Sequence, residues 1–366
     1  MDIDIVAPID LTQTQKNVWG SIQESHPFLN DPFLSWEFAS AVARVKKNIE
    51  IAVMSRSGQP CGFLAFERER NQGRPIASLV NELQAVVVRT SENWHANDLL
   101  QPTNLKQWTF DCGPAFQKPL AYSRFCIDEF PYADMSLGFD EYKLFHRRRG
   151  SNFIAQLERK KRKLEREVGK LSYEFQCTDF EKPLNQLFQW KSDQYRQSGK
   201  LDVLKLEWVR NLIRETLQIK GASMAGILST LRVGDELVAT HLGLKNDKTL
   251  NCWFPAYSPA SKFQKYSPGM LLMLCILKDL PNLGIDRFHF GRGNERYKMN
   301  LKNGHYEIVE GSLTPHALRW KMNQAYFQIR NAISSTGLLS PVLTMFRQQK
   351  QRLLRLKESR SASKLV

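Results

Sequence analysis

The stretch over residues 253–301, WFPAYSPASKFQKYSPGMLLMLCILKDLPNLGIDRFHFGRGNERYKMNL, carries most of the information about the fold. Its pattern predicts a strand that ends near Tyr257, a polar loop, and an apolar helix over residues 269–280. A short strand over residues 285–290 and a loop containing two glycines follow. Strands that flank a helix in this order indicate an α/β architecture.

The loop before this helix has the composition of an anion-binding site. Ser267 is expected to cap the helix, Pro268 suits the first turn, and Gly269 allows close approach of the backbone. Free N–H groups at a helix N-terminus attract anions, and Lys262 and Lys265 add positive charge. The pattern therefore predicts a phosphate-binding loop, with a capped core helix that binds nothing as the alternative.

Two predicted hairpins suggest that the chain contains related units. Strands over residues 223–233 and 236–244 are joined by a tight turn at Gly234. In the first half, strands over residues 49–55 and 61–67 are joined by a similar glycine-containing turn. The two hairpins favour two α/β units in tandem.

The length, 366 residues, accommodates two domains of average size, and 42% hydrophobic residues indicate packed cores rather than disorder. The charge is uneven along the chain. Residues 1–145 carry five more acidic than basic residues, whereas the remainder carries twenty more basic than acidic residues. The excess is concentrated in residues 147–163 and 347–364, which predicts either solvated helix faces or an anionic partner.

Several classes of protein are excluded by the pattern. Residues 1–11 contain three aspartates and no basic start, which argues against a signal peptide. No apolar run approaches the ~20 residues of a membrane-spanning helix. The six cysteines are isolated and form no C-x-x-C pair, so we expect no metal site and reduced thiols. These features predict a cytoplasmic protein, which binds peripherally at the inner face of the membrane if the basic tail contacts anionic lipids.

The predicted order of hairpin, third strand, loop, helix and strand resembles the core of the GNAT acyltransferase fold. The loop pattern Q/R-x-x-G-x-G/A of that fold appears here as Gln264-x-x-Ser267-x-Gly269, with serine in place of the first glycine. The segment DRFHFGRGNERYK, residues 286–298, resembles the signature of CelD/BcsL-type (BioF2-like) acetyltransferases. Residues 253–257, 266–269 and 32–38 resemble further motifs of that family.

This resemblance implies two tandem GNAT-like domains in the manner of FemAB-type transferases. Each would be a mixed, mostly antiparallel sheet flanked by helices, and further helices would follow at the C-terminus. The expected divisions are a degenerate N-terminal domain (1–150), a basic connecting helix (151–170), a catalytic domain (171–315), and C-terminal helices with a basic tail (316–366).

The function that the resemblance implies is transfer of an acyl group from an acyl-CoA to a nitrogen or oxygen atom of a sugar or sugar-nucleotide. The acyl group expected first is acetyl, with acetyl-CoA as the donor. The family is associated with bacterial exopolysaccharide or cellulose production. One alternative is a FemAB-like peptidyltransferase that uses aminoacyl-tRNA, with the basic helix over residues 159–170 holding the RNA. Another is a non-catalytic GNAT-fold component of a polysaccharide-synthesis complex, since Ser267 departs from the loop pattern.

Acyl transfer requires a polarised carbonyl, a base and close placement of two substrates. His241 is the first candidate base, with Glu295 and Asp286 as rivals, although a lone histidine on a strand is more often structural. Tyr297 or Tyr257 is a candidate proton donor to the leaving thiolate. Lys298 is a candidate for neutralising developing charge or holding an anionic acceptor, unless it is a surface lysine. The predicted cofactor-binding residues are Trp253, Tyr257, Lys262, Gln264, Ser267 and Gly269.

Overall fold

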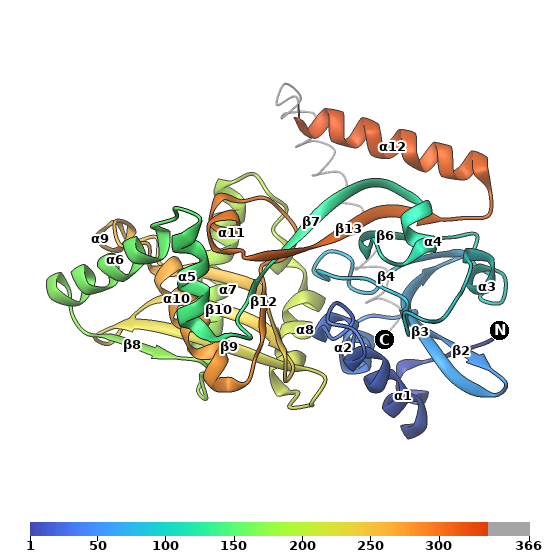
Figure 1. Ribbon diagram of the computed structural model, residues 1–366, viewed down its shortest axis with the longest axis horizontal. Helices are drawn as coiled ribbons and strands as arrows, with labels where there is room; N and C mark the ends of the chain where they lie inside the picture. The colour runs from blue at the N-terminus through green and yellow to red at the C-terminus, as the bar shows by residue number, and fades with distance from the viewer. Residues whose placement is uncertain (336–366) are drawn as a thin grey trace, which may run out of the picture.

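A single mixed, mostly antiparallel sheet runs through the whole molecule in the computed structural model, which describes residues 1–335 (Figure 1). Its strands are β1 (Asp2–Val6), β2 (Ile49–Arg56), β3 (Gln59–Glu69), β4 (Gln72–Pro75), β5 (Val87–Val88), β6 (Gln107–Pro114), β7 (Arg124–Asp134), β8 (Leu171–Glu174), β9 (Ala225–Val233), β10 (Glu236–Lys245), β11 (Thr249–Tyr257), β12 (Arg287–His289) and β13 (Gly304–Leu313). Their order is β1-β2-β3-β4-β6-β13-β7-β12-β11-β10-β9-β8, and β5 pairs with β3. The β4–β6 and β11–β12 pairs are parallel.

Helices cover both faces of this sheet. They are α1 (Gln13–Glu24), α2 (Trp36–Val45), α3 (Ala96–Leu100), α4 (Lys118–Tyr122), α5 (Gly138–Arg148), α6 (Phe153–Glu167), α7 (Glu181–Gln197), α8 (Glu207–Gln218), α9 (Ser261–Gln264), α10 (Pro268–Asp279), α11 (Arg296–Leu301) and α12 (Ala317–Ser335). One core lies between the sheet and α1, α2, α7 and α8, and a second lies under α6 and α10. A smaller third core is covered by α3 and α4.

Local sequence chemistry explains several of these elements. The Ser35 hydroxyl accepts a hydrogen bond from the Phe38 N–H at 3.1 Å and so caps α2. Strands β9 and β10 are joined by a two-residue turn in which Gly234 has φ of 58°, a conformation that suits glycine. The predicted β2–β3 hairpin and the apolar helix α10 are likewise confirmed.

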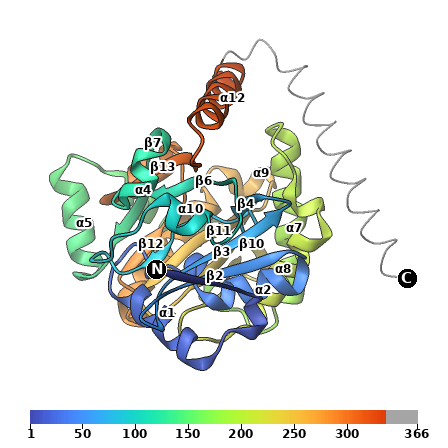
Figure 2. The same cartoon turned by 90° about the vertical axis from the view of Figure 1, so that its right-hand side faces the viewer.

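The two halves of the chain are interleaved. Strand β13, which follows α11 in sequence, lies between β6 and β7 of the first half. Strand β7 also pairs with β12 and so joins the halves into one sheet. The first core is shared as well, because α2 contacts α8 across it, as Figure 2 shows from the side. The domain boundaries given above therefore stay predictions, and the strand order does not follow them.

The C-terminal region is described only in part. The first predicted C-terminal helix is confirmed as α12, whereas the second predicted helix and the basic tail lie outside the described residues. Within residues 1–335, no helix combines the length and apolar character needed to cross a bilayer.

Candidate active site

Strands β11 and β12 separate after a short stretch of pairing. They pair from Thr249–Arg287 to Asn251–His289, after which β11 continues beside β10 while the chain leaves β12. A bulge in the β10–β11 register leaves Trp253 opposite no residue of β10. The second half of β11 therefore presents backbone groups along an edge that β12 does not cover, and such N–H groups are suited to polarising a carbonyl.

Beyond β11, the chain returns through α9 into the N-terminus of α10. Ser267 precedes α10 with φ of 58° and ψ of 61°, and its side chain makes no capping hydrogen bond. Ser267 therefore occupies the predicted N-cap position, but its side chain does not make the expected capping bond. Its hydroxyl instead accepts a hydrogen bond from Nζ of Lys160, on α6, at 2.8 Å. Gly269 lies against the ring of Tyr257, because a Cβ at Gly269 would stand 3.0 Å from Cδ1 of Tyr257.

The two lysines expected at this loop are engaged elsewhere. Lys262 pairs with Glu236 at 2.6 Å, and Lys265 pairs with Glu167 at 3.2 Å. Lys160, from a distant part of the sequence, brings a positive charge to the start of α10 through its bond to Ser267. The loop thus keeps the features of an anion site, although its lysine differs from the expected ones.

The predicted cofactor residues other than the two lysines lie in three places. Tyr257, Ser267 and Gly269 lie together at the N-terminus of α10. Gln264 donates to the carbonyl of Pro259 at 3.0 Å in the preceding turn. Trp253 is buried on the side of the first core, where its indole N–H donates to the carbonyl of Val80 at 2.7 Å. The Trp253 side chain therefore connects the two halves of the chain through its bond to Val80, and it does not line the loop before α10.

The glycine-containing loop after β12 is built around a buried lysine. Nζ of Lys298, whose residue is 6% exposed, donates to the carbonyls of Gly291 at 3.2 Å and Arg292 at 2.7 Å. It also pairs with Glu295 at 3.1 Å. Gly291 and Gly293 have φ of 77° and 121°, which favours glycine at both positions. Lys298 therefore holds the loop in place. Because its side chain is buried, it is not the surface lysine that was the alternative.

Glu82 faces this loop from the first half of the chain. Its carboxylate occupies the space that a Cβ at Gly291 would need. Burial raises the pKa of Glu82 to about 7, partly offset by the charge of Lys298 and reinforced by Asp111. A carboxylate with this pKa exchanges protons near neutral pH, as a general base must. Nothing in the sequence around Glu82 forms a motif, so sequence reasoning missed it.

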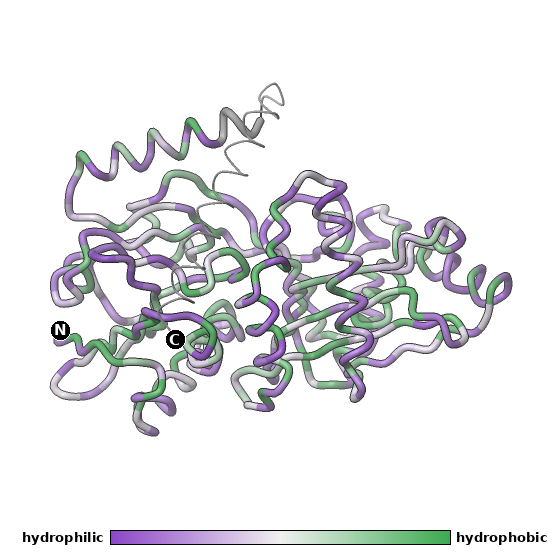
Figure 3. The backbone as a smooth tube through the Cα atoms, turned by 180° about the vertical axis from the view of Figure 1, so that it is seen from behind, coloured by the Kyte–Doolittle hydropathy of each residue, from purple (hydrophilic) through white to green (hydrophobic). Residues whose placement is uncertain are grey.

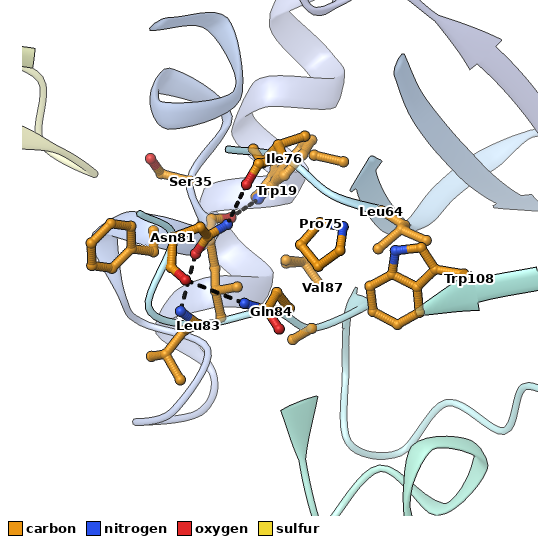
Figure 4. A pocket seen from close by; sticks show the side chains of 14 residues that line it. Trp19, Ser35, Leu64, Pro75, Ile76, Asn81, Leu83, Gln84, Val87 and Trp108 are labelled. Carbon is orange, nitrogen blue, oxygen red and sulfur yellow. Dashed lines mark hydrogen bonds between the residues drawn. The ribbon is translucent and has the colours of Figure 1, made fainter. Parts of the chain in front are cut away.

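The segment that carries Glu82 is held by its neighbours. Asn81 donates through Nδ2 to the carbonyl of Ile76 at 3.1 Å and accepts from the N–H of Leu83 at 3.0 Å, beside the small cavity in Figure 4. Oε1 of Gln84 accepts from the N–H groups of Asp111 at 3.0 Å and Cys112 at 2.8 Å. These bonds fix the backbone on both sides of Glu82.

Helix α7 adds two ionisable groups to the surroundings of Glu82. Nζ of Lys191 donates to the carbonyl of Pro255 on β11 at 3.0 Å, and burial lowers the pKa of Lys191. Burial, together with the charge of Glu82, raises the pKa of Tyr195 to about 12. Burial also raises the pKa of Tyr297, and the negative charges of Glu295 and Glu82 raise it further. Glu82 and the three residues of the neighbouring loop and helix whose charges act with it are named here the Glu82 cluster: Glu82, Glu295, Tyr297 and Lys298.

Two predicted site residues lie away from the Glu82 cluster. His241 is buried against Phe288, neither of its ring nitrogens has a hydrogen-bond partner in the part of the chain that the structure describes, and burial lowers its pKa to about 3. Asp286 precedes β12, at the end opposite to the glycine loop, and pairs with Lys248 at 3.1 Å. The geometry thus favours neither as the base. Within residues 1–335, no group of three or more histidine, cysteine or acidic residues is placed to hold a metal.

Comparison with known proteins supports this architecture. Residues 151–299 match the family described as "Acetyltransferase (GNAT) domain". The structure resembles that of FemX, with a TM-score of 0.57 and 11% identity, covering 88% of this chain and 100% of FemX. No curated protein matches the chain in sequence.

Two further solved structures are similar at lower scores. A C-terminal domain of a putative lysylphosphatidylglycerol synthetase from Agrobacterium fabrum has a TM-score of 0.49 and 11% identity, covering 81% of this chain and 91% of the domain. A tandem GNAT protein from the clavulanic acid biosynthesis pathway has a TM-score of 0.46 and 10% identity, covering 86% and 100%.

The expected fold class is confirmed, since a large, mostly antiparallel sheet flanked by helices is shared with FemX over most of the chain. The CelD/BcsL-type assignment is finer than these findings and stays a prediction. Residues 151–299 match a GNAT acetyltransferase domain, and on this match the protein is an acyltransferase.

Proposed function

We propose that the protein transfers an acyl group from an acyl-CoA to an amine or hydroxyl group of a sugar or sugar-nucleotide. The observation that carries this proposal is Glu82, a carboxylate that lies against Gly291 and whose pKa burial raises to about 7, in a segment tied to β11 by the hydrogen bond from Trp253 to Val80. Sugar as the acceptor, and a role in exopolysaccharide or cellulose production, rest on the motif resemblance of residues 32–38 and 286–298.

The donor would lie along β11 toward α10. The pyrophosphate of CoA suits the start of α10, where the N–H of Gly269, the Ser267 hydroxyl and the Lys160 ammonium are close together. The thioester carbonyl would then meet the backbone near the bulge at Trp253. This placement uses the predicted residues Tyr257, Ser267 and Gly269 and replaces the charge of Lys262 by that of Lys160.

In the reaction, Glu82 accepts the proton of the acceptor group as its nitrogen or oxygen bonds to the acyl carbon. The carbon–sulfur bond then breaks, and the CoA thiolate leaves with the electron pair and is protonated. Glu82 returns its proton to solvent or to the thiolate. A positioned base contributes roughly 10²–10⁴-fold to such a reaction. Lys298 acts as a positioning residue, because its ammonium holds the Gly291–Arg292 backbone against Glu82.

Ligand-induced stabilisation tests the donor. Thermal unfolding should shift upward with acetyl-CoA, longer acyl-CoAs or free CoA, because ligand at 100 times its Kd adds about 2.7 kcal/mol of stability. Lys160→Ala should weaken this shift, whereas Lys262→Ala, whose lysine pairs with Glu236, should leave it nearly unchanged. No shift with any CoA species in the wild-type protein would contradict the proposal. Thiol release with a panel of amino sugars and sugar-nucleotides would then identify the acceptor.

An aminoacyl-tRNA donor is the second candidate. Arginines on α5, α6 and the turn between them are exposed and form no ion pair within the described part of the chain: Arg147, Arg148, Arg149, Arg159 and Arg162. Such a surface suits a phosphate backbone. If this candidate is right, tRNA should bind with a steep salt dependence and CoA should not; a CoA-dependent shift without tRNA binding would remove it.

A further inference from the structure

Within residues 1–335, the contacts between helix α12 and the sheet all lie on one face of the helix. The rings of Trp320 and Phe327 pack on Phe125 of β7, with centroids 5.7 Å and 5.6 Å away. Asn323 donates to Gln107 at 3.0 Å and to Ser312 at 3.1 Å. Together with the pairing of Arg330 to Glu310, these contacts fix which side of α12 faces the sheet. Its opposite side faces outward at the periphery of the molecule (Figure 1).

The outward face of α12 carries an apolar stripe. Its residues are between 59% and 73% exposed and recur at steps of four, four and three: Leu318, Met322, Tyr326 and Ile329. At 3.6 residues per turn these side chains fall on one narrow side of the helix. In Figure 3 hydrophobic and hydrophilic residues alternate along α12, as expected for a helix with two different faces. The stripe is larger than the single exposed apolar residues that are normal on a surface.

The charges around the stripe are all positive. Helix α12 contains no acidic residue, and Arg319 and Lys321 flank the stripe on its two sides. The sequence beyond α12 continues this trend, because residues 347–364 contain seven basic residues and one acidic residue. An apolar stripe bordered by Lys and Arg is the pattern of a helix that lies in the interface of an anionic membrane.

We propose that α12 docks the protein on an anionic lipid surface, with Leu318, Met322, Tyr326 and Ile329 entering the headgroup region. A second copy of this chain suits the stripe less well. In a symmetric dimer Arg319 and Lys321 would meet their own counterparts with no acidic residue of α12 between them. Four side chains alone also supply less area than the ~800 Å² per partner of a stable interface. Nucleic acid would use the charges but leave the apolar stripe in water.

The proposal is independent of the acyl donor and is tested with the full-length protein. Co-sedimentation with phosphatidylcholine vesicles that contain phosphatidylglycerol should retain the wild-type protein, and vesicles of phosphatidylcholine alone should retain much less. The triple variant Leu318→Ser, Met322→Ser, Ile329→Ser should bind anionic vesicles at least tenfold more weakly, because it removes the buried apolar area. Raised salt should weaken the wild-type binding without abolishing it.

A matched control uses exposed apolar residues from other surfaces. Ile9 and Leu137 are 87% and 81% exposed, and Ile9→Ser with Leu137→Ser should leave vesicle binding unchanged. Circular dichroism and acyl-transfer activity on a soluble acceptor should be the same in all three proteins. Equal vesicle binding by the triple variant and the wild type would overturn the proposal. So would a wild-type dimer that the triple variant loses, without vesicle binding by either.

Discussion

Nδ1 of His289 lies 2.8 Å from Oδ2 of Asp31, and both side chains are completely buried. The same Asp31 oxygen accepts from Nδ2 of Asn251 at 3.0 Å, while its second oxygen accepts from the N–H of Phe33 at 2.9 Å. Asn251 and His289 form the last residue pair between β11 and β12. Asp31 therefore ties the N-terminal segment to the point where the two strands separate.

Removal of Asp31 should destabilise the protein strongly. Asp31→Ala leaves the His289 and Asn251 side chains buried without their partner, and each buried polar group left unsatisfied costs about 1–3 kcal/mol. Urea unfolding measures the change. Asp4→Ala, at an exposed position on β1, is the control and should shift the midpoint little. A midpoint for Asp31→Ala equal to that of the control would show that the buried bonds contribute no net stability.

Glu82→Gln should reduce turnover by about 10²-fold or more without unfolding the protein, because it removes the base. The wild-type rate should rise about tenfold from pH 6 to pH 8, since burial raises the pKa of Glu82 to about 7 and the base acts in its ionised form. Glu295→Gln is the matched control, because Glu295 is half exposed and its pKa is lowered from the usual value. Glu295→Gln should keep the rise with pH, and a Glu82→Gln enzyme that also kept it would refute the assignment.

Gly291→Ala should lower both activity and stability. Gly291 has φ of 77°, which costs a non-glycine residue about 1–3 kcal/mol, and a methyl group would also collide with the Glu82 carboxylate. Gly58→Ala isolates the backbone term, because Gly58 has φ of 76° and open space around its Cα. Urea unfolding and turnover should separate the two variants. Equal losses in both would mean that the contact with Glu82 has no effect.

His241→Leu should leave turnover unchanged and raise stability at neutral pH. An unpartnered buried polar group costs about 1–3 kcal/mol, and leucine fills a similar volume. Because burial lowers the pKa of His241 from 6.5 to about 3, the unfolded chain binds the proton first as pH falls below 6.5. The wild type should therefore lose more stability than His241→Leu between pH 6.5 and pH 4, as measured by thermal unfolding. A large loss of turnover in His241→Leu would restore this histidine as the base.

Local chemistry in the sequence was sufficient for many elements and for part of the site. Pro32 and Ser35 indicate the start of α2, and the Gly234 turn indicates a hairpin. Apolar residues at helical spacing predict α10. These features depend on residues within a few positions of one another, so a sequence pattern captures them. The Glu295–Lys298 motif is of the same kind, because its loop closes on its own backbone.

The relationships that depend on distant parts of the chain were decided by the tertiary structure. Glu82 meets Gly291, Lys160 meets Ser267, and β13 enters the sheet between β6 and β7. The pKa of Glu82 follows from burial by residues of both halves, and the apolar stripe of α12 is defined only once the opposite face is packed. Sequence periodicity sets which residues share a face of a helix or strand, because neighbouring residues determine it. Long-range packing decides which faces contact each other and which carboxylate is removed from solvent, and so has its pKa raised.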